Sequence, residues 1–269
     1  MKFDDKIDII MSVYNAEKTL SQAIDSILGQ TYKNIRLIIC NDCSTDESQK
    51  ILDNYSIRYP EKFLIIKNEK NMRLAYSLNK CLEYVNTEFV ARMDADDIST
   101  PQRIEKQLEF LKLHKQFMVV GTGMGIFYDD PCNYTIRHPV IKPNRYTLRK
   151  TVPFAHATIL ARTEMYHKLD GYTVAERTIT GQDYDMWFRF YQAGMEGANI
   201  DEPLYLCRED INTYKRRLFR YRWNEFKTAI IGYHNLDYPL YWYWEPTIQL
   251  LKGLIPARLV YIINKNKHG

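Results

Sequence analysis

The 269-residue sequence lacks several features that would assign it to a class of proteins at once. It contains no apolar run of about 18 residues, so we do not expect a membrane-spanning helix. Its first residues, Met1–Asp8, lack the apolar core of a signal peptide, which favours a cytoplasmic location. The five cysteines are an odd number at irregular spacing, which indicates reduced thiols. Cys40 and Cys43 form a single Cys-x-x-Cys motif, and the further ligands of a zinc site are missing.

Glycine-rich phosphate-binding loops are also missing. The turns after the expected strands contain neither Gly-x-Gly-x-x-Gly nor a Walker loop. Gly121–Gly125 is rich in glycine and follows an expected strand, but no clear helix comes after it. A bound nucleotide would therefore be held by side chains and a metal ion.

The most informative stretch that is present runs from Phe89 to Ile98. Residues rich in β-formers lead directly into Asp94, Asp96 and Asp97, which predicts a buried strand that opens into an acidic loop. Neighbouring carboxylates repel one another unless a cation lies among them. Open α/β sheets also place their ligands at strand tips. We therefore predict a divalent metal ion held by Asp94 and Asp96, with Asp97 nearby.

Three other interpretations of this loop are weaker. An acidic turn that caps the next helix, with Thr100 as N-cap and Pro101 as first helical residue, leaves the preceding carboxylates unexplained. An EF-hand fails because Ile98 and Ser99 stand where an oxygen ligand and a glycine are required. A phosphatase with Asp94 as nucleophile would need threonine in place of Ile98. That class of enzyme would also need the acidic loop to follow the first strand of the sheet.

Strands and helices alternate through the first 120 residues, which predicts a parallel sheet with helices on both faces. The expected strands are 7–13, 35–40, 63–66, 89–93 and 118–120, and the last helix of this part is 101–114. Ser44 and Glu47 have the spacing of a capping box for the second helix. The polar loops 14–17, 41–46 and 94–99 should emerge at one edge of the sheet, where a nucleotide would bind.

Beyond residue 130 the alternation breaks down, and titratable residues stand out at two places. Phe154–Ala161 has the composition of a further strand, with His156 at its entry, and this histidine is either a metal ligand or a structural residue. Residues 180–190 form an expected helix with Asp183 and Asp185 in its first turn. Both acids complement the helix dipole there, and one of them could instead accept a substrate proton as a base.

Four stretches, taken together and in order, resemble family 2 glycosyltransferases with the GT-A fold, particularly bacterial enzymes that build capsule, exopolysaccharide or lipopolysaccharide chains. They are Ile9–Asn15, Ile39–Asp46, Ala91–Ile98 with Pro101 and Arg103, and Gly181–Trp187. The resemblance implies a GT-A catalytic domain at residues 1–210, an α/β fold with a mostly parallel sheet flanked by helices. Residues 211–269 would be a helical, aromatic and basic extension.

The resemblance also implies which residues bind a nucleotide-diphosphate sugar, with UDP-sugar as the first expectation. These residues are Val13, Tyr14, Asn15, Glu17, Asp42, Arg73, Asp94 and Ala95. Asp42 would contact the base. Asp94 and Asp96 would hold Mn²⁺ or Mg²⁺ on the diphosphate, because a metal ion stabilises the charge of that leaving group. Asp183 would be the general base for the acceptor hydroxyl. A single displacement with inversion at the anomeric carbon follows, and the acceptor would be a glycan or a lipid-linked sugar.

The sequence departs from the family pattern at three positions. Gln182 replaces a common glutamate before Asp183, and Cys43 and Arg73 stand where glycine is usual. These departures bear on donor choice more than on the type of reaction. Gln182 also keeps open a non-catalytic protein that binds sugar nucleotides or glycans, although the intact aspartates argue for a metal-dependent hexosyltransferase.

The C-terminal tail differs from the rest of the chain in charge. Residues 205–269 contain 11 basic and five acidic side chains, whereas residues 1–204 contain 26 and 28. Basic residues alternate there with tyrosine, phenylalanine and tryptophan, which suits an interfacial membrane helix or a nucleic-acid surface. Because the family's acceptors are often lipid-linked, we favour peripheral contact with the inner face of the cell membrane and expect no nucleic acid. The alternative is a tail that packs on the catalytic domain or on a second subunit.

Overall fold

A computed structural model describes residues 5–209 and 219–251, except the side chain of Arg220. The described residues contain a nine-stranded sheet in the order β3-β2-β1-β4-β8-β6-β9-β5, with β7 paired to β6. The strands are β1 (Ile7–Val13), β2 (Ile35–Asn41), β3 (Phe63–Lys67), β4 (Phe89–Asp94), β5 (Ile98–Ser99), β6 (Phe117–Phe127), β7 (Thr135–Arg137), β8 (Leu160–Arg162) and β9 (Glu196–Arg208). β3, β2, β1 and β4 are parallel, so the loops after them meet at one edge, as predicted.

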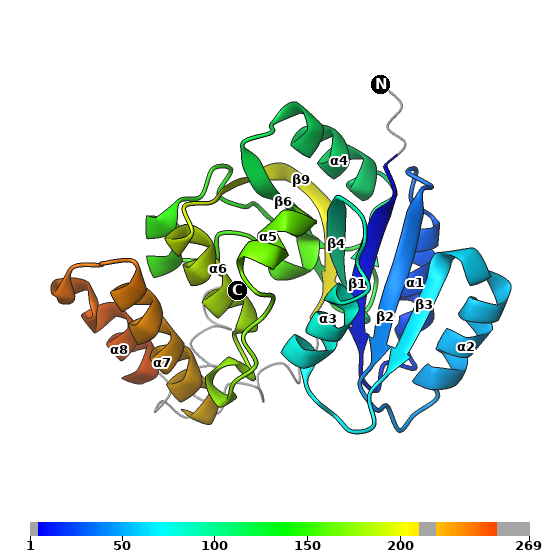
Figure 1. Cartoon of the computed structure of the whole chain (residues 1–269), viewed down its shortest axis with the longest axis horizontal. Coiled ribbons are helices and arrows are strands. Elements are labelled where there is room, and N and C mark those ends of the chain that lie inside the picture. Colours follow the sequence, from blue (N-terminus) through cyan, green and yellow to red (C-terminus); the bar gives the residue numbers. More distant parts are fainter. Residues whose placement is uncertain (1–4, 210–218, 252–269) are drawn as a thin grey trace.

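Helices cover both faces of the sheet (Figure 1). The α-helices are α1 (Leu20–Leu28), α2 (Ser48–Arg58), α3 (Leu74–Leu82), α4 (Arg103–Leu113), α5 (Thr163–Lys168), α6 (Gln182–Gln192), α7 (Phe219–Asn235) and α8 (Trp244–Leu251). Short 3₁₀ turns lie at Pro60–Lys62, Arg145–Arg149, His156–Thr158, Glu176–Thr178 and Leu240–Trp242. Side chains alternate between the two faces of a strand, so Ile9 belongs to the core under α1, α2 and α4, and Ile10 to the core under α3, α5, α6 and α7. This confirms the predicted α/β architecture.

The predicted capping box at Ser44 is wrong. The Ser44 hydroxyl accepts a hydrogen bond from the backbone N–H of Asn15 at 3.0 Å, so it is engaged with the neighbouring loop. α2 begins only at Ser48, whose N–H donates to the carboxylate of Asp46 at 3.0 Å. A partner 29 residues away in the sequence has displaced the local cap.

The predicted start of the helix after the acidic loop is also wrong by two residues. The Thr100 hydroxyl donates to the carbonyl of Leu204 at 3.0 Å and caps nothing. Pro101 and Gln102 form a turn, and α4 begins at Arg103. The contact between the β5 segment and β9 therefore fixes where the chain can enter the helix.

The glycine-rich stretch Gly121–Gly125 is part of β6, which is much longer than the predicted strand. A Cβ atom on Gly121 would lie 2.2 Å from the side-chain oxygen of Asn199, and one on Gly123 would lie 2.9 Å from the carbonyl oxygen of Glu202. These glycines allow β6 and β9 to approach closely. They have no phosphate-binding geometry.

The strand predicted at Phe154–Ala161 is wrong in its first half. The backbone N–H of Thr158 donates to the carbonyl of Ala155 at 2.9 Å and its hydroxyl donates to the same carbonyl at 2.8 Å, which closes a 3₁₀ turn. The strand β8 starts at Leu160. His156 therefore lies in a buried turn.

The described part of the C-terminal tail packs against the rest of the protein. α7 contacts α6, and α8 contacts α7, as Figure 1 shows at the left of the view. Tyr233 and Tyr238 are buried in the core that contains Phe188. No helix among the described residues is long and apolar enough to cross a membrane. The basic residues Lys215–Arg217 and the apolar stretch 252–263 lie outside the described residues.

Candidate active site

A cavity of about 450 Å³ opens where β1, β2 and β4 end. Its walls come from the three loops that the sequence placed at one edge, from the start of α3, and from two later segments. The lining residues are Ser12, Tyr14, Asn15, Ala16, Thr19, Asp42, Asn71, Arg73, Leu74, Asp94, Ala95, Asp96, Ile179, Thr180 and Tyr221. Residues far apart in the sequence therefore enclose one space.

The acidic loop after β4 forms the floor of this cavity. One carboxylate oxygen from each of Asp94, Asp96 and Asp97 lies within 4.8 Å of the others. Oxygen ligands of this kind suit the hard cations Mg²⁺ and Mn²⁺. Burial, together with the negative charges of Asp94 and Asp96, raises the pKa of Asp97 to about 7. The crowded negative charge fits a divalent cation at this position.

The loop is fixed from below by β9. The Tyr205 hydroxyl accepts a hydrogen bond from the backbone N–H of Asp94 at 3.1 Å and bonds to the carboxyl group of Asp97. The backbone N–H of Arg208 donates to Asp97 at 2.8 Å, and its side-chain Nε donates to the carbonyl of Asp96 at 3.1 Å. Asp97 is 3% exposed and so mainly holds the loop, which leaves Asp94 and Asp96 to face the cavity.

Two fully buried arginines lie under the same loop. Arg103 donates from its terminal nitrogen to the carbonyls of Arg92, Ala157 and Ile159, and from Nε to Gln107. Arg92 instead forms an ion pair with the carboxylate of Asp94. The first arginine ties backbone segments together, whereas the second contacts an acid of the site.

Asp42 organises the loop that carries Arg73. Its carboxylate accepts hydrogen bonds from the side chain of Asn68 at 2.8 Å and from the backbone N–H groups of Met72 at 2.7 Å and Arg73 at 2.8 Å. The side chain of Asp42 lines the cavity although it is almost completely buried. Most of the hydrogen bonds that the Asp42 carboxylate accepts therefore hold the loop that contains Met72 and Arg73.

Two of the departures from the family pattern adopt a glycine-like backbone. Cys43 has φ 61° and Arg73 has φ 75°, both in the left-handed region that glycine adopts most easily. Such conformations cost about 1 to 3 kcal/mol for other residues and gather at functional sites. The backbone at Cys43 and Arg73 is therefore of the kind that glycine adopts, and Arg73 adds its side chain to the cavity lining.

The two acids at the start of α6 have different environments. Asp185 pairs with Arg177 at 2.5 Å and with Arg189 at 2.8 Å and accepts a hydrogen bond from Thr173 at 2.6 Å, so it is a structural anchor. Asp183 has no ion pair among the described residues and accepts a hydrogen bond from the N–H of Tyr184 at 2.9 Å.

The pKa of Asp183 is raised by burial, lowered by the N–H of Tyr184 and the charge of Arg92, and raised again by the charge of Asp94. The electrostatic influence of Arg92 and Asp94 links Asp183 to the acidic loop. Of the two acids, Asp183 is therefore the one that no arginine holds among the described residues.

His156 is not part of the acidic group. Burial and the positive charge of Arg92 hold its pKa well below the ordinary value, so the imidazole is neutral. Its Nε2 lies 2.8 Å from the hydroxyl of Tyr172. We therefore correct the expectation that His156 joins Asp94 and Asp96 as a ligand, because its ring is engaged in a buried network.

The structure brings most of the other predicted site residues together. Tyr14, Asn15, Asp42, Arg73, Asp94, Ala95 and Asp96 all line the cavity. Val13 is completely buried in the core beside it, and Glu17 binds the neighbouring loop through the N–H of Glu47 at 3.0 Å. These two residues shape the cavity walls without lining them.

The residues of the site that the sequence reasoning missed as individual contributors include Arg92, Tyr205 and Tyr221. Arg92 had a signal, since a charged residue in an apolar strand next to acids needs a partner. Tyr205 is 111 residues away from Asp94 and had none. Tyr221 stood within the aromatic tail, and nothing distinguished it from its neighbours.

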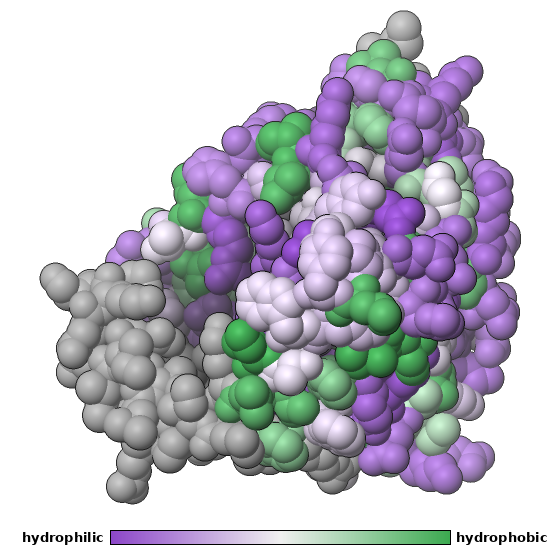
Figure 2. All heavy atoms as spheres, turned by 90° about the vertical axis from the view of Figure 1, so that its left-hand side faces the viewer, coloured by the Kyte–Doolittle hydropathy of each residue, from purple (hydrophilic) through white to green (hydrophobic). Residues whose placement is uncertain are grey.

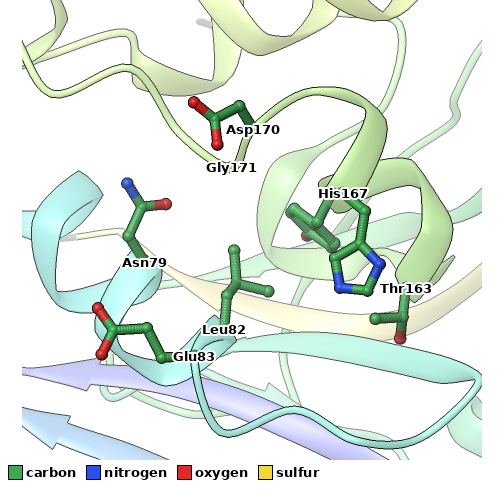
Figure 3. A pocket seen from close by; sticks show the side chains of 8 residues that line it. Asn79, Leu82, Glu83, Thr163, His167, Asp170 and Gly171 are labelled. Carbon is green, nitrogen blue, oxygen red and sulfur yellow. The ribbon is translucent and has the colours of Figure 1, made fainter.

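A second cavity of about 390 Å³ lies between α3 and α5 (Figure 3). Asn79 approaches it from α3 and Glu83 from the turn after that helix, and His167 and Asp170 approach it from α5 and the turn after it. None of the acids of the first cavity lines it. This second cavity is therefore separate from the acidic loop.

Comparison with known proteins agrees with this geometry. Residues 8–169 match the protein family described as Glycosyl transferase family 2. The chain belongs to glycosyltransferase family 2. EpsE of Bacillus subtilis, named as a glycosyltransferase, is 39% identical over 265 residues, 97% of this chain and 94% of that protein. AmsE of Erwinia amylovora, named as an amylovoran biosynthesis glycosyltransferase, is 27% identical over 82% of each protein.

Solved structures of two transferases share the fold of this family 2 chain. S. aureus TarS 1-349 in complex with UDP-GlcNAc has a TM-score of 0.68 at 16% identity, and the match covers 84% of this chain and 66% of that chain. The mannosyltransferase PcManGT from Pyrobaculum calidifontis, in complex with GDP-Man and Mn²⁺, has a TM-score of 0.67 at 14% identity, covering 98% and 80%. At these identities the likeness establishes the fold, and it confirms the predicted GT-A class.

Proposed function

We propose that this protein is a metal-dependent, inverting glycosyltransferase that moves a sugar from a nucleotide-diphosphate sugar to a hydroxyl group of a glycan or lipid-linked acceptor. The observation that carries the proposal is the placement of Asp94 and Asp96 on the floor of a 450 Å³ cavity, with Asp183 under the electrostatic influence of the same group. Membership of family 2 supports the reaction type.

Asp94 and Asp96 would hold Mn²⁺ or Mg²⁺, since their oxygens are close together and face the cavity. The bound cation would supply electrostatic stabilisation of the departing diphosphate. Tyr205 and Arg208 hold the loop so that this pair keeps its position.

Tyr14, Asn15, Asp42, Arg73 and Ala95 would contact the donor, because they line the cavity around that pair. Val13 and Glu17 would act by placing Tyr14 and Asn15. Our first expectation for the nucleotide is UDP. Its support is the shared fold of TarS in complex with UDP-GlcNAc, and PcManGT with GDP-Man makes a guanosine donor the alternative.

Asp183 would take the proton of the acceptor hydroxyl as that oxygen attacks the anomeric carbon. The second acid of the helix, Asp185, is held by two arginines and is not available as a nucleophile. One base and no second carboxylate nucleophile give a single displacement, so the configuration at the anomeric carbon inverts.

The acceptor would belong to the synthesis of capsule, exopolysaccharide or lipopolysaccharide. The name of AmsE, an amylovoran biosynthesis glycosyltransferase, supports a polysaccharide product. We treat residues 1–210 as the catalytic domain and residues 211–269 as an extension that positions the protein at its acceptor.

The extension would bind the inner face of the cell membrane peripherally. Figure 2 shows hydrophobic patches on the side of the molecule where α7 and α8 lie. Leu240 is 83% exposed and Tyr241 is 70% exposed in this region. If the membrane proposal holds, replacing both by serine weakens sedimentation with anionic lipid vesicles. Ile57→Ser, at an 80% exposed position on α2, should leave it unchanged. Equal sedimentation of all three proteins would refute it.

The proposed reaction is tested by nucleotide release from UDP-, GDP- and dTDP-sugars with Mn²⁺ and with a chelator. We expect one donor to turn over only with the metal ion. NMR of the product should show an inverted anomeric linkage. Consumption of no donor under any condition would contradict the proposal and favour a protein that only binds its ligand.

A further inference from the structure

Arg92 is an unusual residue for the centre of a sheet. It lies in β4 beside Ile10 of β1 and is 2% exposed. Taking a guanidinium group out of water is costly unless a charge and hydrogen bonds compensate for it. A single ion pair with Asp94 provides the charge.

Comparison with Arg103 shows what is different about this pairing. Arg103 is equally buried, and its guanidinium is occupied by carbonyl oxygens and Gln107. The Nε of Arg92 has no hydrogen-bond partner among the described residues. Arg189, which holds Asp185, also has a buried nitrogen with no partner in the described part of the chain, so what sets Arg92 apart from Arg103 is that its ion pair is with an acid of the site.

The neighbours of Arg92 direct its charge toward the site. His156 and Tyr172 lie within its electrostatic influence, but burial keeps His156 neutral and raises the pKa of Tyr172. The anions that its charge influences include Asp94 and Asp183. Arg92 therefore contacts the acid that faces the donor and acts electrostatically on the acid that would face the acceptor.

We propose that Arg92 is a positioning residue for the transfer reaction: its ion pair fixes one oxygen of Asp94 so that the other faces the divalent cation and nucleotide-diphosphate sugar. This inference rests on the proposed function. With Oδ2 of Asp94 bound to Arg92, the side-chain torsion of Asp94 is defined before any ligand arrives. The buried positive charge of Arg92 also reduces the electrostatic repulsion among the carboxylates of the site, so that they can lie near one another.

The test compares Arg92→Met, which keeps the length but removes the charge, with Arg92→Lys, which keeps the charge but removes the planar fork. Arg36→Met is the matched control. Arg36 forms an equally direct ion pair with buried Asp8 at 2.7 Å, at the opposite edge of the sheet. Mn²⁺ affinity by calorimetry, kcat, KM for the donor and Tm are measured for each full-length protein.

We expect Arg92→Met to weaken Mn²⁺ binding by about tenfold or more, as loss of a group that orients a metal ligand does. Arg92→Lys should bind Mn²⁺ more tightly than Arg92→Met while its kcat remains about tenfold below wild type. Arg36→Met should lose thermal stability and keep wild-type Mn²⁺ affinity. If Arg92 positions Asp94, loss of Mn²⁺ affinity therefore occurs in Arg92→Met and not in Arg36→Met, although both variants lose an ion pair.

Wild-type Mn²⁺ affinity and kcat in Arg92→Met would overturn the inference. So would equal losses of Mn²⁺ affinity in Arg92→Met and Arg36→Met. If Arg92→Met does not fold, Arg92→Lys decides, and a wild-type kcat in that variant would also overturn it. Failure of the proposed function is a different result, because the wild-type protein would then consume no donor while the Mn²⁺ comparison still reports on Arg92.

Discussion

The hydroxyl of Tyr205 accepts a hydrogen bond from the backbone N–H of Asp94, at 3.1 Å, across 111 residues of sequence. This bond joins the tip of β4 to β9. It means that the position of the acidic loop is set by a strand that the sequence motif does not include. The acidic loop is consequently a tertiary feature as well as a motif.

Replacing Tyr205 by phenylalanine should therefore impair the loop. We expect a loss of about 1 kcal/mol in the free energy of unfolding from the missing hydroxyl. Mn²⁺ affinity should fall as well, because Asp97 loses a hydrogen bond that helps to hold it. Tyr55→Phe, which removes a hydroxyl bound to Asp25 at 2.7 Å far from the site, should affect stability alone. Unchanged Mn²⁺ affinity in Tyr205→Phe would refute this account of the loop.

The pH dependence of the reaction should reflect Asp183. Burial raises the pKa of this carboxyl group, and a base must be deprotonated to accept a proton. The acid limb of a kcat profile should accordingly lie above the ordinary range of aspartate. The same raised pKa affects stability in the opposite direction to activity. A carboxyl group whose pKa is higher in the folded state than in the unfolded state stabilises the protein at low pH, and this contribution is lost as the pH rises through the folded-state pKa. An acid limb at the ordinary aspartate value would contradict the assignment.

Asp185 provides a contrast on the same helix turn. Asp185→Asn should cost about 2 kcal/mol in unfolding free energy, because a buried carboxylate that binds charged partners is lost. The folded fraction should still transfer sugar at a similar rate. Asp183→Asn should have the reverse effects on stability and activity. Equal loss of activity in both variants, measured at a temperature where both are folded, would show that the two acids are not divided in this way.

The docking of the C-terminal helices can be tested at Gly232. A Cβ atom there would lie 2.2 Å from Cγ of Phe188, so α7 would have to move away from α6. Gly232→Ala should destabilise the protein by about 1 to 3 kcal/mol, despite the better helix propensity of alanine. Ile231→Ala, at a half-exposed position of the same helix, is the control. A stabilised Gly232→Ala protein would show that α7 does not pack in this way.

The sequence predicted the parallel half of the sheet and the cavity because both depend on local patterns. Apolar strands ending in polar loops placed Tyr14, Asp42 and Asp94 at one edge, and the structure confirms that these residues line one cavity. The errors occurred where a distant partner competes with a local signal. Ser44 binds the N–H of Asn15 instead of capping a helix. Similarly, the composition around His156 suggested a strand. The contact of the His156 ring with the hydroxyl of Tyr172 depends on the tertiary fold, and no local pattern indicates it.

The central claim is a division of labour between Asp96 at the metal ion and Asp183 at the acceptor. The most direct measurement is donor binding by calorimetry and donor turnover in the presence of Mn²⁺, in wild type, Asp96→Ala, Asp183→Asn and the control Asp53→Ala on exposed α2. The account predicts that Asp96→Ala loses both donor binding and donor turnover. Asp183→Asn should bind the donor like wild type but should not transfer the sugar. Asp53→Ala should resemble wild type in both measurements. Wild-type transfer by Asp183→Asn, or by Asp96→Ala, would contradict it.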